Sequence, residues 1–197
     1  MALVLTQHGI NSLAQGGGGG GDFVEIGGRK YPVVKIGSQL WITENLDYKC
    51  VVVGGNLDTT AARAWYYNND ENTYGENGLK YGLLYNFASI NVINGLLPDG
   101  WRVPSNSDLT TLMSFVGGGT AAGYKLKSRS WNGSDEFGFN MLPGGMAWGA
   151  FYFVGQYGYL WSTNKNRWNF KPSVDLSYEN ISADYAAFSV RILKDAA

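Results

Sequence analysis

Short runs of glycine and aromatic residues near the C-terminus constrain the fold of this chain more than any other feature. The run Phe137-Gly-Phe-Asn-Met-Leu-Pro-Gly-Gly145 is followed by Tyr157-Gly-Tyr-Leu-Trp-Ser-Thr163 and then by Phe188-Ser-Val-Arg191. Glycines at such corners permit positive φ angles and close backbone approach, and aromatic residues suit short strands. Between these runs, residues 146–153 and 164–170 follow neither the period of a strand nor that of a helix. The pattern predicts a rigid frame that carries an exchangeable surface.

Composition bounds the class of protein. The chain has 197 residues, of which 45% are hydrophobic and 15% aromatic, enough for one domain with a substantial core. Its formal net charge is -1, so it lacks the basic surface that nucleic-acid binding requires. No stretch approaches the roughly 18 apolar residues of a membrane span. The 13 tyrosines and 7 tryptophans suit both core packing and binding surfaces, and both uses are expected.

The reactive side chains give no catalytic pattern. Cys50 is the single cysteine, so it cannot form an intrachain disulfide, and the single histidine, His8, lies far from it in the sequence. Acidic residues such as Asp135 and Glu136 form no recognisable string of calcium ligands. We therefore expect no enzyme activity, no metal and no cofactor.

The N-terminal segment is expected to be separate from the main domain. Residues 1–5 are apolar but too short for a signal peptide, which predicts synthesis in the cytoplasm without secretion by that route. Residues 16–21 are six consecutive glycines and predict a linker. Residues 1–15 would then be either an attachment peg or a disordered end, and both alternatives stay open. Residues 22–197 form the main domain.

The coarse pattern predicts an α+β fold. Residues 23–26 and 31–36 flank a Gly-Gly pair and predict a hairpin. Two helices are expected, one over residues 83–93 and one over 105–116, the latter with Ser105 as N-cap. Short antiparallel strands with irregular connections should make up the remainder.

A spaced set of motifs resembles a known family. The set comprises Val34-x-Ile36-Gly-x-Gln39-x-Trp41-x-x-Glu44-Asn-Leu46, Tyr81-Gly-x-Leu84-Tyr85, Leu97-Pro-x-Gly-Trp-Arg-Val-Pro-Ser105, Leu126-Lys127, Gly138-Phe-Asn-x-Leu-Pro-Gly-Gly145, Leu160-Trp-Ser162 and Ser189-Val-Arg191. Together these resemble the Fibrobacter succinogenes major paralogous domain family, over roughly residues 24–194. The resemblance implies a C-type lectin-like fold, related to formylglycine-generating enzymes and to variable proteins of diversity-generating retroelements. The enzymes need a pair of thiols, which one cysteine cannot supply.

The resemblance also implies a function. In retroelement variable proteins, the stretches that correspond to 146–156 and 164–170 are diversified and project from one face to bind a ligand. The ligand-binding candidates carried over in this way are Met146, Ala147, Trp148, Ala150, Tyr152, Phe153, Gln156, Asn164, Asn166, Arg167, Trp168 and Phe170. Of these, Trp148, Tyr152, Phe153 and Trp168 are the expected anchors.

The expected protein is thus a receptor-binding module associated with a phage tail. Its partner would be a bacterial cell-surface protein or glycan, and residues 1–15 would contact tail components. Relatives of this kind suggest a homotrimer, although no coiled-coil heptad is visible. The alternative is a structural or adhesin subunit with a fixed contact surface. Within the frame, Trp161 and Val190 should lie inside, and Arg191 should point outward towards a carboxylate.

Overall fold

Strands dominate the fold of the domain. The computed structural model describes residues 21–57, 59–75, 80–173, 176–181 and 184–197. Within those residues, thirteen strands form three sheets of four, three and six strands, accompanied by four α-helices. The predicted peg and most of the predicted glycine linker, residues 1–20, lie outside the described residues.

The first sheet is built on a tight hairpin and is closed by the C-terminus. Its strand order is β1 (Phe23–Ile26), β2 (Arg29–Ile36), β3 (Gln39–Ile42) and β13 (Leu193–Asp195), all antiparallel. Gly27 and Gly28 turn the chain between β1 and β2 with φ angles of 59° and 82°, which residues with a Cβ rarely adopt. The predicted hairpin is confirmed.

The other two sheets contain the remaining strands. The three-stranded sheet has the order β11 (Leu176–Asn180), β10 (Asn166–Phe170) and β9 (Gly158–Trp161). The six-stranded sheet joins segments far apart in the sequence: β4 (Val52–Val53), β5 (Arg63–Trp65), β6 (Leu84–Asn86), β12 (Ala187–Phe188), β7 (Met146–Ala147) and β8 (Phe151–Tyr152). Only the pairing of β4 with β5 is parallel among these described strands.

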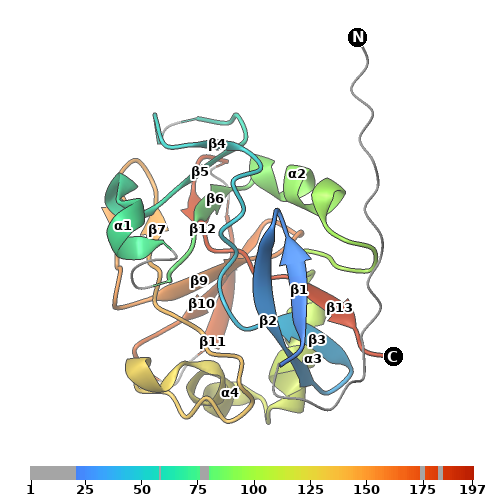
Figure 1. Ribbon diagram of the computed structural model, residues 1–197. Coiled ribbons are helices and arrows are strands. Elements are labelled where there is room, and N and C mark those ends of the chain that lie inside the picture. Colours follow the sequence, from blue (N-terminus) through green and yellow to red (C-terminus); the bar gives the residue numbers. More distant parts are fainter. Residues whose placement is uncertain (1–20, 58, 76–79, 174–175, 182–183) are drawn as a thin grey trace.

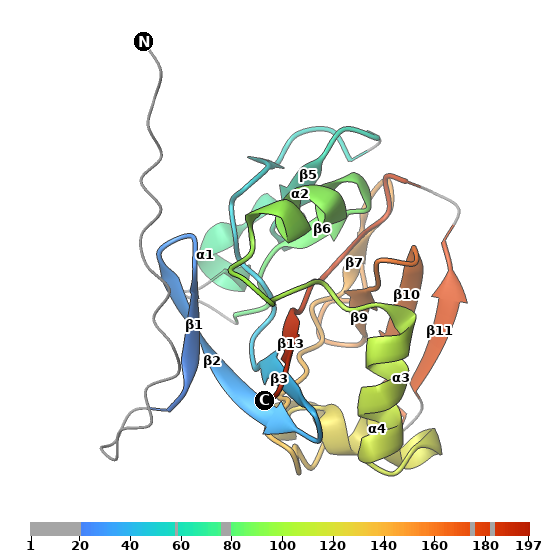
Figure 2. The same ribbon diagram turned by 90° about the vertical axis from the view of Figure 1, so that its right-hand side faces the viewer.

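The helices are short and lie at two ends of the molecule. At one end are α3 (Asn106–Phe115) and α4 (Gly119–Leu126), and α2 (Ala88–Leu96) lies at the opposite end with β4 and β5 (Figures 1 and 2). The helical turn α1 (Glu71–Tyr74) and the 3-10 turns η1 (Tyr67–Asn69) and η2 (Arg129–Trp131) complete the set. Ser105 and Asp108 form a capping box at the start of α3, which confirms the predicted N-cap.

The predicted fold class, an α+β domain of C-type lectin type with two helices, is wrong. Residues 84–86 form β6, so the first predicted helix begins only at Ala88. Gly117–Gly119 end α3 as expected, with φ angles of 108°, 64° and 55°, but α4 follows at once. Most remaining elements are strands of two to five residues, and some of them, such as β12 and β13, pair with strands far away in the sequence that no local pattern can reveal.

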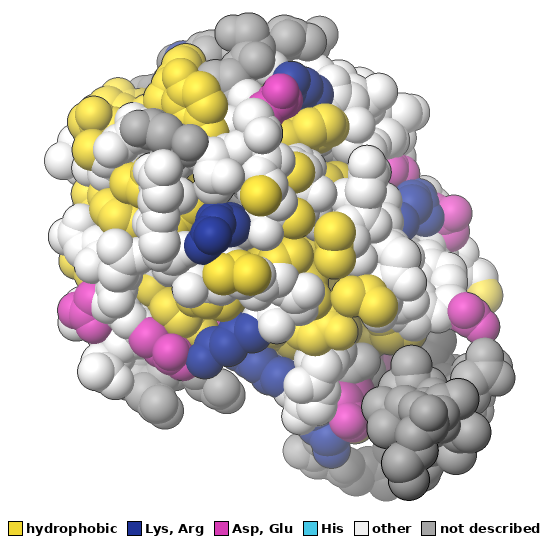
Figure 3. Space-filling view, turned by 90° about the horizontal axis from the view of Figure 1, so that it is seen from above, with side chains coloured by type: hydrophobic (Ala, Val, Ile, Leu, Met, Phe, Trp, Pro, Cys, Tyr) yellow, Lys and Arg dark blue, Asp and Glu magenta, His cyan; other side chains and the backbone are white. Residues whose placement is uncertain are grey.

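The end of the molecule that carries β4 and α2 exposes hydrophobic side chains. Figure 3 views this end and shows such side chains across much of the surface, with charged ones scattered among them. Val52 and Val53 of β4, with Val92 and Leu96 of α2, are between 36% and 59% exposed. We refer to these four residues as the β4–α2 patch.

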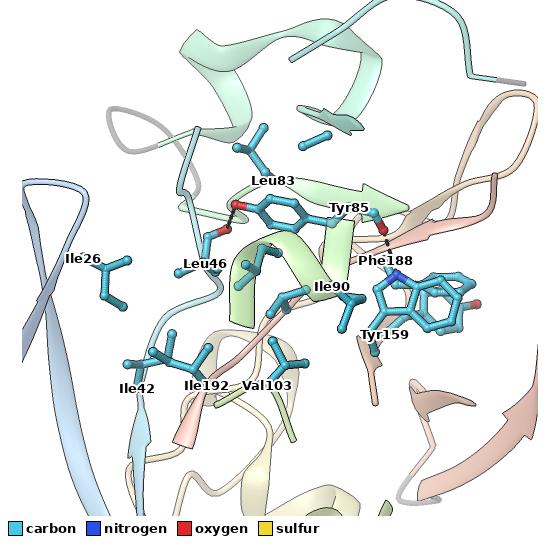
Figure 4. Packing of buried hydrophobic residues seen from close by; sticks show 14 of the residues in the cluster. Ile26, Ile42, Leu46, Leu83, Tyr85, Ile90, Val103, Tyr159, Phe188 and Ile192 are labelled. Carbon is cyan, nitrogen blue, oxygen red and sulfur yellow. Dashed lines mark hydrogen bonds between the residues drawn. The ribbon is translucent and has the colours of Figure 1, made fainter. Parts of the chain in front are cut away.

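The largest buried cluster joins the first sheet to α2 and the six-stranded sheet. Ile26, Ile42 and Leu46 pack with Ile90 and Phe188, and the hydroxyl of Tyr85 donates to the carbonyl of Leu46 (Figure 4). The indole N–H of Trp161 donates a hydrogen bond of 2.7 Å to the carbonyl of Tyr85. Trp161 and Val190 are fully buried, as the sequence predicted.

Nine consecutive residues at the C-terminus connect all three sheets. Ala187 and Phe188 form β12 in the six-stranded sheet, and Ser189 makes a bridge to Leu160 in the three-stranded sheet. Residues 193–195 then form β13 in the first sheet. The position of this segment therefore sets the positions of the sheets relative to one another.

The side chain of Arg191 fixes this segment from within. It is fully buried, and its Nε donates a hydrogen bond of 3.1 Å to Oδ1 of Asn45. Its two terminal nitrogens donate to the carbonyls of Ile42, Phe139 and Asn140. Burial lowers the pKa of the guanidinium, and the more distant carboxylates of Glu44 and Asp135 act in the opposite direction. The expectation that Arg191 points outward to a carboxylate is wrong, because its acceptors are carbonyl and amide oxygens inside the domain.

Arg191→Met should lower the free energy of unfolding by about 3 kcal/mol or more, because it leaves buried carbonyls without donors. Arg191→Lys should recover less than half of this loss, because one ammonium cannot reach all four acceptors. Urea denaturation followed by tryptophan fluorescence measures both.

The control is Arg129→Met, since the hydrogen bond that Nε of Arg129 donates to the carbonyl of Ser134 lies at the surface. This variant should change stability by less than about 0.5 kcal/mol. If Arg191→Met unfolds at the same urea concentration as the wild-type chain, Arg191 does not hold the C-terminal segment.

Candidate functional site

The β7–β8 hairpin presents two different faces. Met146 pairs with Tyr152, and Ala147 pairs with Phe151. The backbone N–H of Trp148 donates a hydrogen bond of 2.8 Å to the carbonyl of Ala150, which closes the turn. Since side chains alternate along a strand, Ala147 and Phe151 share one face and pack against a buried cluster of Trp65, Tyr67 and Leu84. Met146 and Tyr152 face the other way.

On that second face lies a pocket of about 370 Å³, lined by Met146, Trp148, Tyr152 and Phe153. The three aromatic side chains are 39%, 42% and 40% exposed, whereas Met146 is 8% exposed. The rings therefore form open walls around a largely covered thioether. We call these four residues the aromatic pocket.

A continuous series of rings supports one wall of the aromatic pocket from the core. The ring centroid of Phe153 lies 5.8 Å from that of Tyr152 and 5.2 Å from that of Tyr157. Tyr157 stacks on Tyr159 at 5.9 Å with an angle of 4° between the planes, and Tyr159 contacts the buried Phe188 at 5.5 Å. Ring pairs at such distances add to the stability that burial provides, so the wall has a fixed backing.

Backbone geometry also fixes this wall. Phe153 has a φ of 63°, which is unusual for a large L residue. Its carbonyl accepts the N–H groups of Gln156 and Tyr157, both at 3.0 Å. Gly145 makes the fit possible, because a Cβ there would lie 2.5 Å from the carbonyl oxygen of Tyr152 and 2.7 Å from the nitrogen of Val154. The close backbone approach predicted for the Pro143–Gly145 corner is confirmed at Gly145.

Tyr185 belongs to the site, although no motif in the sequence pointed to it. Its ring centroid lies 6.5 Å from that of Trp148, in an edge-to-face arrangement. The contact exists because β12 pairs antiparallel with β7 through Ala187 and Ala147, which carries the residues before β12 past the hairpin turn. No local pattern relates positions 148 and 185.

The second predicted segment, residues 164–170, does not join this surface. Trp168 and Phe170 are each 1% exposed, so the prediction that they project from an outer face is wrong. The indole N–H of Trp168 donates a hydrogen bond of 3.1 Å to Oδ1 of Asn106, at the start of α3. Asn164 is exposed, and its Oδ1 accepts the backbone N–H of Asn106 at 2.8 Å, so it secures the same helix end. Phe170 stacks on Phe139.

The reason for this burial is the place of β10 in its sheet. β10 pairs with β9 on one side and β11 on the other, so it is a central strand. Asn166, at 8% exposure, is buried with it. A central strand covered on its faces carries an almost continuous run of buried residues, without the alternation that marks a half-exposed strand.

The remaining predicted residues divide between support and rim. The guanidinium of Arg167 lies 5.0 Å from the ring centroid of Tyr159 and 5.5 Å from that of Phe188, and its Nη1 contacts the sulfur of Met146 at 3.6 Å. Arg167 therefore supports the floor of the aromatic pocket from behind. Ala147 is fully buried, whereas Ala150 and Gln156 are exposed.

A family model matches the part of the chain that surrounds this pocket. Residues 34–194 match the model of the Fibrobacter succinogenes major domain, which covers most of the chain. The chain belongs to this family. A search of curated proteins found no match, and neither did a search of solved structures. The family match begins within β2 and ends within β13, so it includes the aromatic pocket, Arg191 and strands from all three sheets, but not β1.

In the described part of the major domain, no three His, Cys, Asp or Glu side chains come together in a way that could hold a metal ion. Every helix in the same residues is too short or too polar to traverse a bilayer. Asp135 accepts the backbone N–H of Asn140 at its Oδ1, and Asp184 forms an ion pair with Lys165.

Replacing Gly145 should destabilise this major domain more than replacing Gly155 in the same loop region. Both glycines have positive φ angles, 69° and 76°, but a Cβ at Gly155 would meet nothing within 4 Å. Gly155→Ala should thus cost about 1–2 kcal/mol through backbone strain alone. Gly145→Ala should cost about 1–3 kcal/mol more, because Tyr152 or Val154 must move. Urea denaturation compares the two, and equal losses would mean that the close approach at Gly145 does not constrain the pocket wall.

Proposed function

We propose that this chain is a non-enzymatic binding protein and that the aromatic pocket is its recognition site. The observation that carries the proposal is the pocket itself: three exposed rings around a thioether, in a hollow of about 370 Å³. Large aromatic side chains dominate binding energies when a partner covers them. The exposed part of each ring gains this energy only when a partner covers it.

The rigidity of the site supports this proposal. Phe153 is held at an unfavourable φ by a glycine corner, by two backbone hydrogen bonds and by the ring of Tyr157. Strain of this kind, about 1–3 kcal/mol, persists where the surroundings enforce it and is typical of functional sites. A wall that is ordered before binding reduces the entropy lost on association.

The chemistry of the lining supports binding rather than catalysis. The four lining side chains are a thioether, an indole, a phenol and a phenyl ring. Such groups provide contact area, whereas proton transfer or nucleophilic attack draws on carboxylates, imidazoles, thiols or activated hydroxyls.

We further propose that the partner is a bacterial cell-surface molecule and that the protein acts on a phage, as a diversified receptor-binding module. Support for this step comes from the resemblance to retroelement variable proteins in the Gly138–Arg191 region of the sequence. In the folded domain, exchangeable positions are compatible with residues 148, 150, 152 and 153, whose side chains are exposed, and not with Trp168 or Phe170.

A second candidate function is a structural or adhesin subunit with a fixed contact surface. The β4–α2 patch favours it, because four exposed aliphatic residues on one edge strand and one helix suit a permanent contact.

The two candidates predict different neighbouring DNA. For the diversified module, we expect a reverse-transcriptase gene and a near-copy of the 138–191 coding sequence, with differences at adenines in the codons for 148–153. Sequencing the locus tests this, and differences concentrated in the codons of Trp168 and Phe170 would contradict the structure.

The direct test is the double variant Trp148→Ala/Tyr152→Ala. Binding to a panel of bacterial cell-surface extracts, measured with the immobilised full chain, should fall at least tenfold, since each ring can contribute about 2 kcal/mol at an interface. The melting temperature should remain within a few degrees, because both side chains are substantially exposed.

The matched control is Phe23→Ala/Tyr124→Ala, which removes two other exposed rings, on β1 and α4. This control should bind as the wild-type chain does. Binding that survives the loss of Trp148 and Tyr152 would place recognition elsewhere, with the β4–α2 patch as the next surface to alter.

A further inference from the structure

We propose that the aromatic pocket receives an uncharged apolar side chain presented by a protein, rather than a sugar ring. The inference rests on the proposed function and narrows its partner to one chemical class.

The polar groups of the pocket are too few for a sugar. Its lining side chains offer two hydrogen-bonding groups, the indole N–H of Trp148 and the hydroxyl of Tyr152. A hexose carries several hydroxyls, each a donor and an acceptor. A hydroxyl turned towards the rings would lose its water without gaining a partner, at a cost of about 1–3 kcal/mol for each, which offsets the gain from stacking.

Neighbouring polar side chains do not supply the missing groups. Gln156 is exposed but does not line the pocket. The guanidinium of Arg167 lies against Tyr159 and Phe188, behind Met146. An apolar side chain needs no such partners and gains from contact with all three rings.

The charges around the pocket favour an uncharged guest. None of its four lining residues is charged. Asp184, next in sequence to the Tyr185 that touches Trp148, forms an ion pair with Lys165. A charged ligand group would therefore lose its hydration without meeting an opposite charge in the lining.

The dimensions and the floor suit one large side chain. The volume of about 370 Å³ is near the lower end of the range for ligand pockets, about 300–1,000 Å³. Met146 forms the floor, and the unbranched thioether of methionine adapts to guests of different shape. Fixed aromatic walls over an adaptable floor would accept Leu, Met, Phe or Trp with graded affinity.

The test uses the full chain labelled with ¹³C at the methionine methyl groups. The chain has four methionines, and Met146→Leu assigns the signal of Met146. The probes are N-acetyl-leucinamide and N-acetyl-tryptophanamide on one side, and the methyl glycosides of glucose, mannose and N-acetylglucosamine on the other. We expect the amides to shift the Met146 methyl signal saturably in the millimolar range, and the glycosides to leave it unchanged. The methyl group of Met141, which is fully buried, serves as the internal reference.

Phe153→Gly removes one wall without straining the backbone, because glycine tolerates the φ of 63°. This variant should weaken amide binding at least fivefold, whereas Tyr124→Ala should leave it unchanged. Amide binding that is equally strong in Phe153→Gly would overturn the inference.

The outcomes separate this inference from the proposed function. If the glycosides shift Met146 and the amides do not, or if neither class of probe does, the inference fails. The proposed function still stands in either case, provided that Trp148→Ala/Tyr152→Ala loses its binding to surface extracts. If the amides bind but that double variant keeps its binding to extracts, the pocket has the inferred chemistry and the proposed function fails.

Discussion

The guanidinium of Arg191 is the interaction on which the arrangement of this domain depends. It joins the end of β3, the loop at residues 139–140 and the last strands of the chain through acceptors on Ile42, Asn45, Phe139 and Asn140. None of these acceptors is a carboxylate, so oriented dipoles offset much of the cost of burying the charge, with the more distant carboxylates of Glu44 and Asp135 and the ring of Phe139 adding to them. Dipoles do so only when their geometry is held closely, and this requirement ties the three segments to one another.

The consequence of that constraint reaches the aromatic pocket. Arg191 lies between β12 and β13, in the segment that connects the three sheets. Because β12 pairs with β7, the residue that holds the C-terminal segment also positions the hairpin that displays Trp148 and Tyr152. Backbone pairing thus links the stability of the domain to the proposed recognition site. Of the pocket side chains, Met146 belongs to the core cluster and the three rings are partly exposed.

Aromatic residues serve both parts of the molecule, and their composition alone does not separate the two uses. Trp161 and Trp168 are buried, with their indole N–H groups bonded to the carbonyl of Tyr85 and to Asn106. Trp148 is 39% exposed and touches only the ring of Tyr185 among the aromatic contacts of the described residues. The series from Phe153 through Tyr157 and Tyr159 to Phe188 passes from one environment to the other. Whether a ring is buried therefore depends on the place in the fold of the segment that carries it.

Local sequence determined the features that depend on local physics. Gly27 and Gly28 specify the first hairpin, Ser105 and Asp108 specify the start of α3, and Gly145 specifies a corner without a Cβ. The spaced motifs also identified the family. Only the tertiary structure decided that Trp168 is inside, that Tyr185 joins the site and that Arg191 is enclosed by carbonyls. The physical reason is that burial depends on which strands flank a segment, and strands that mostly have two to five residues carry too short a pattern to encode those neighbours.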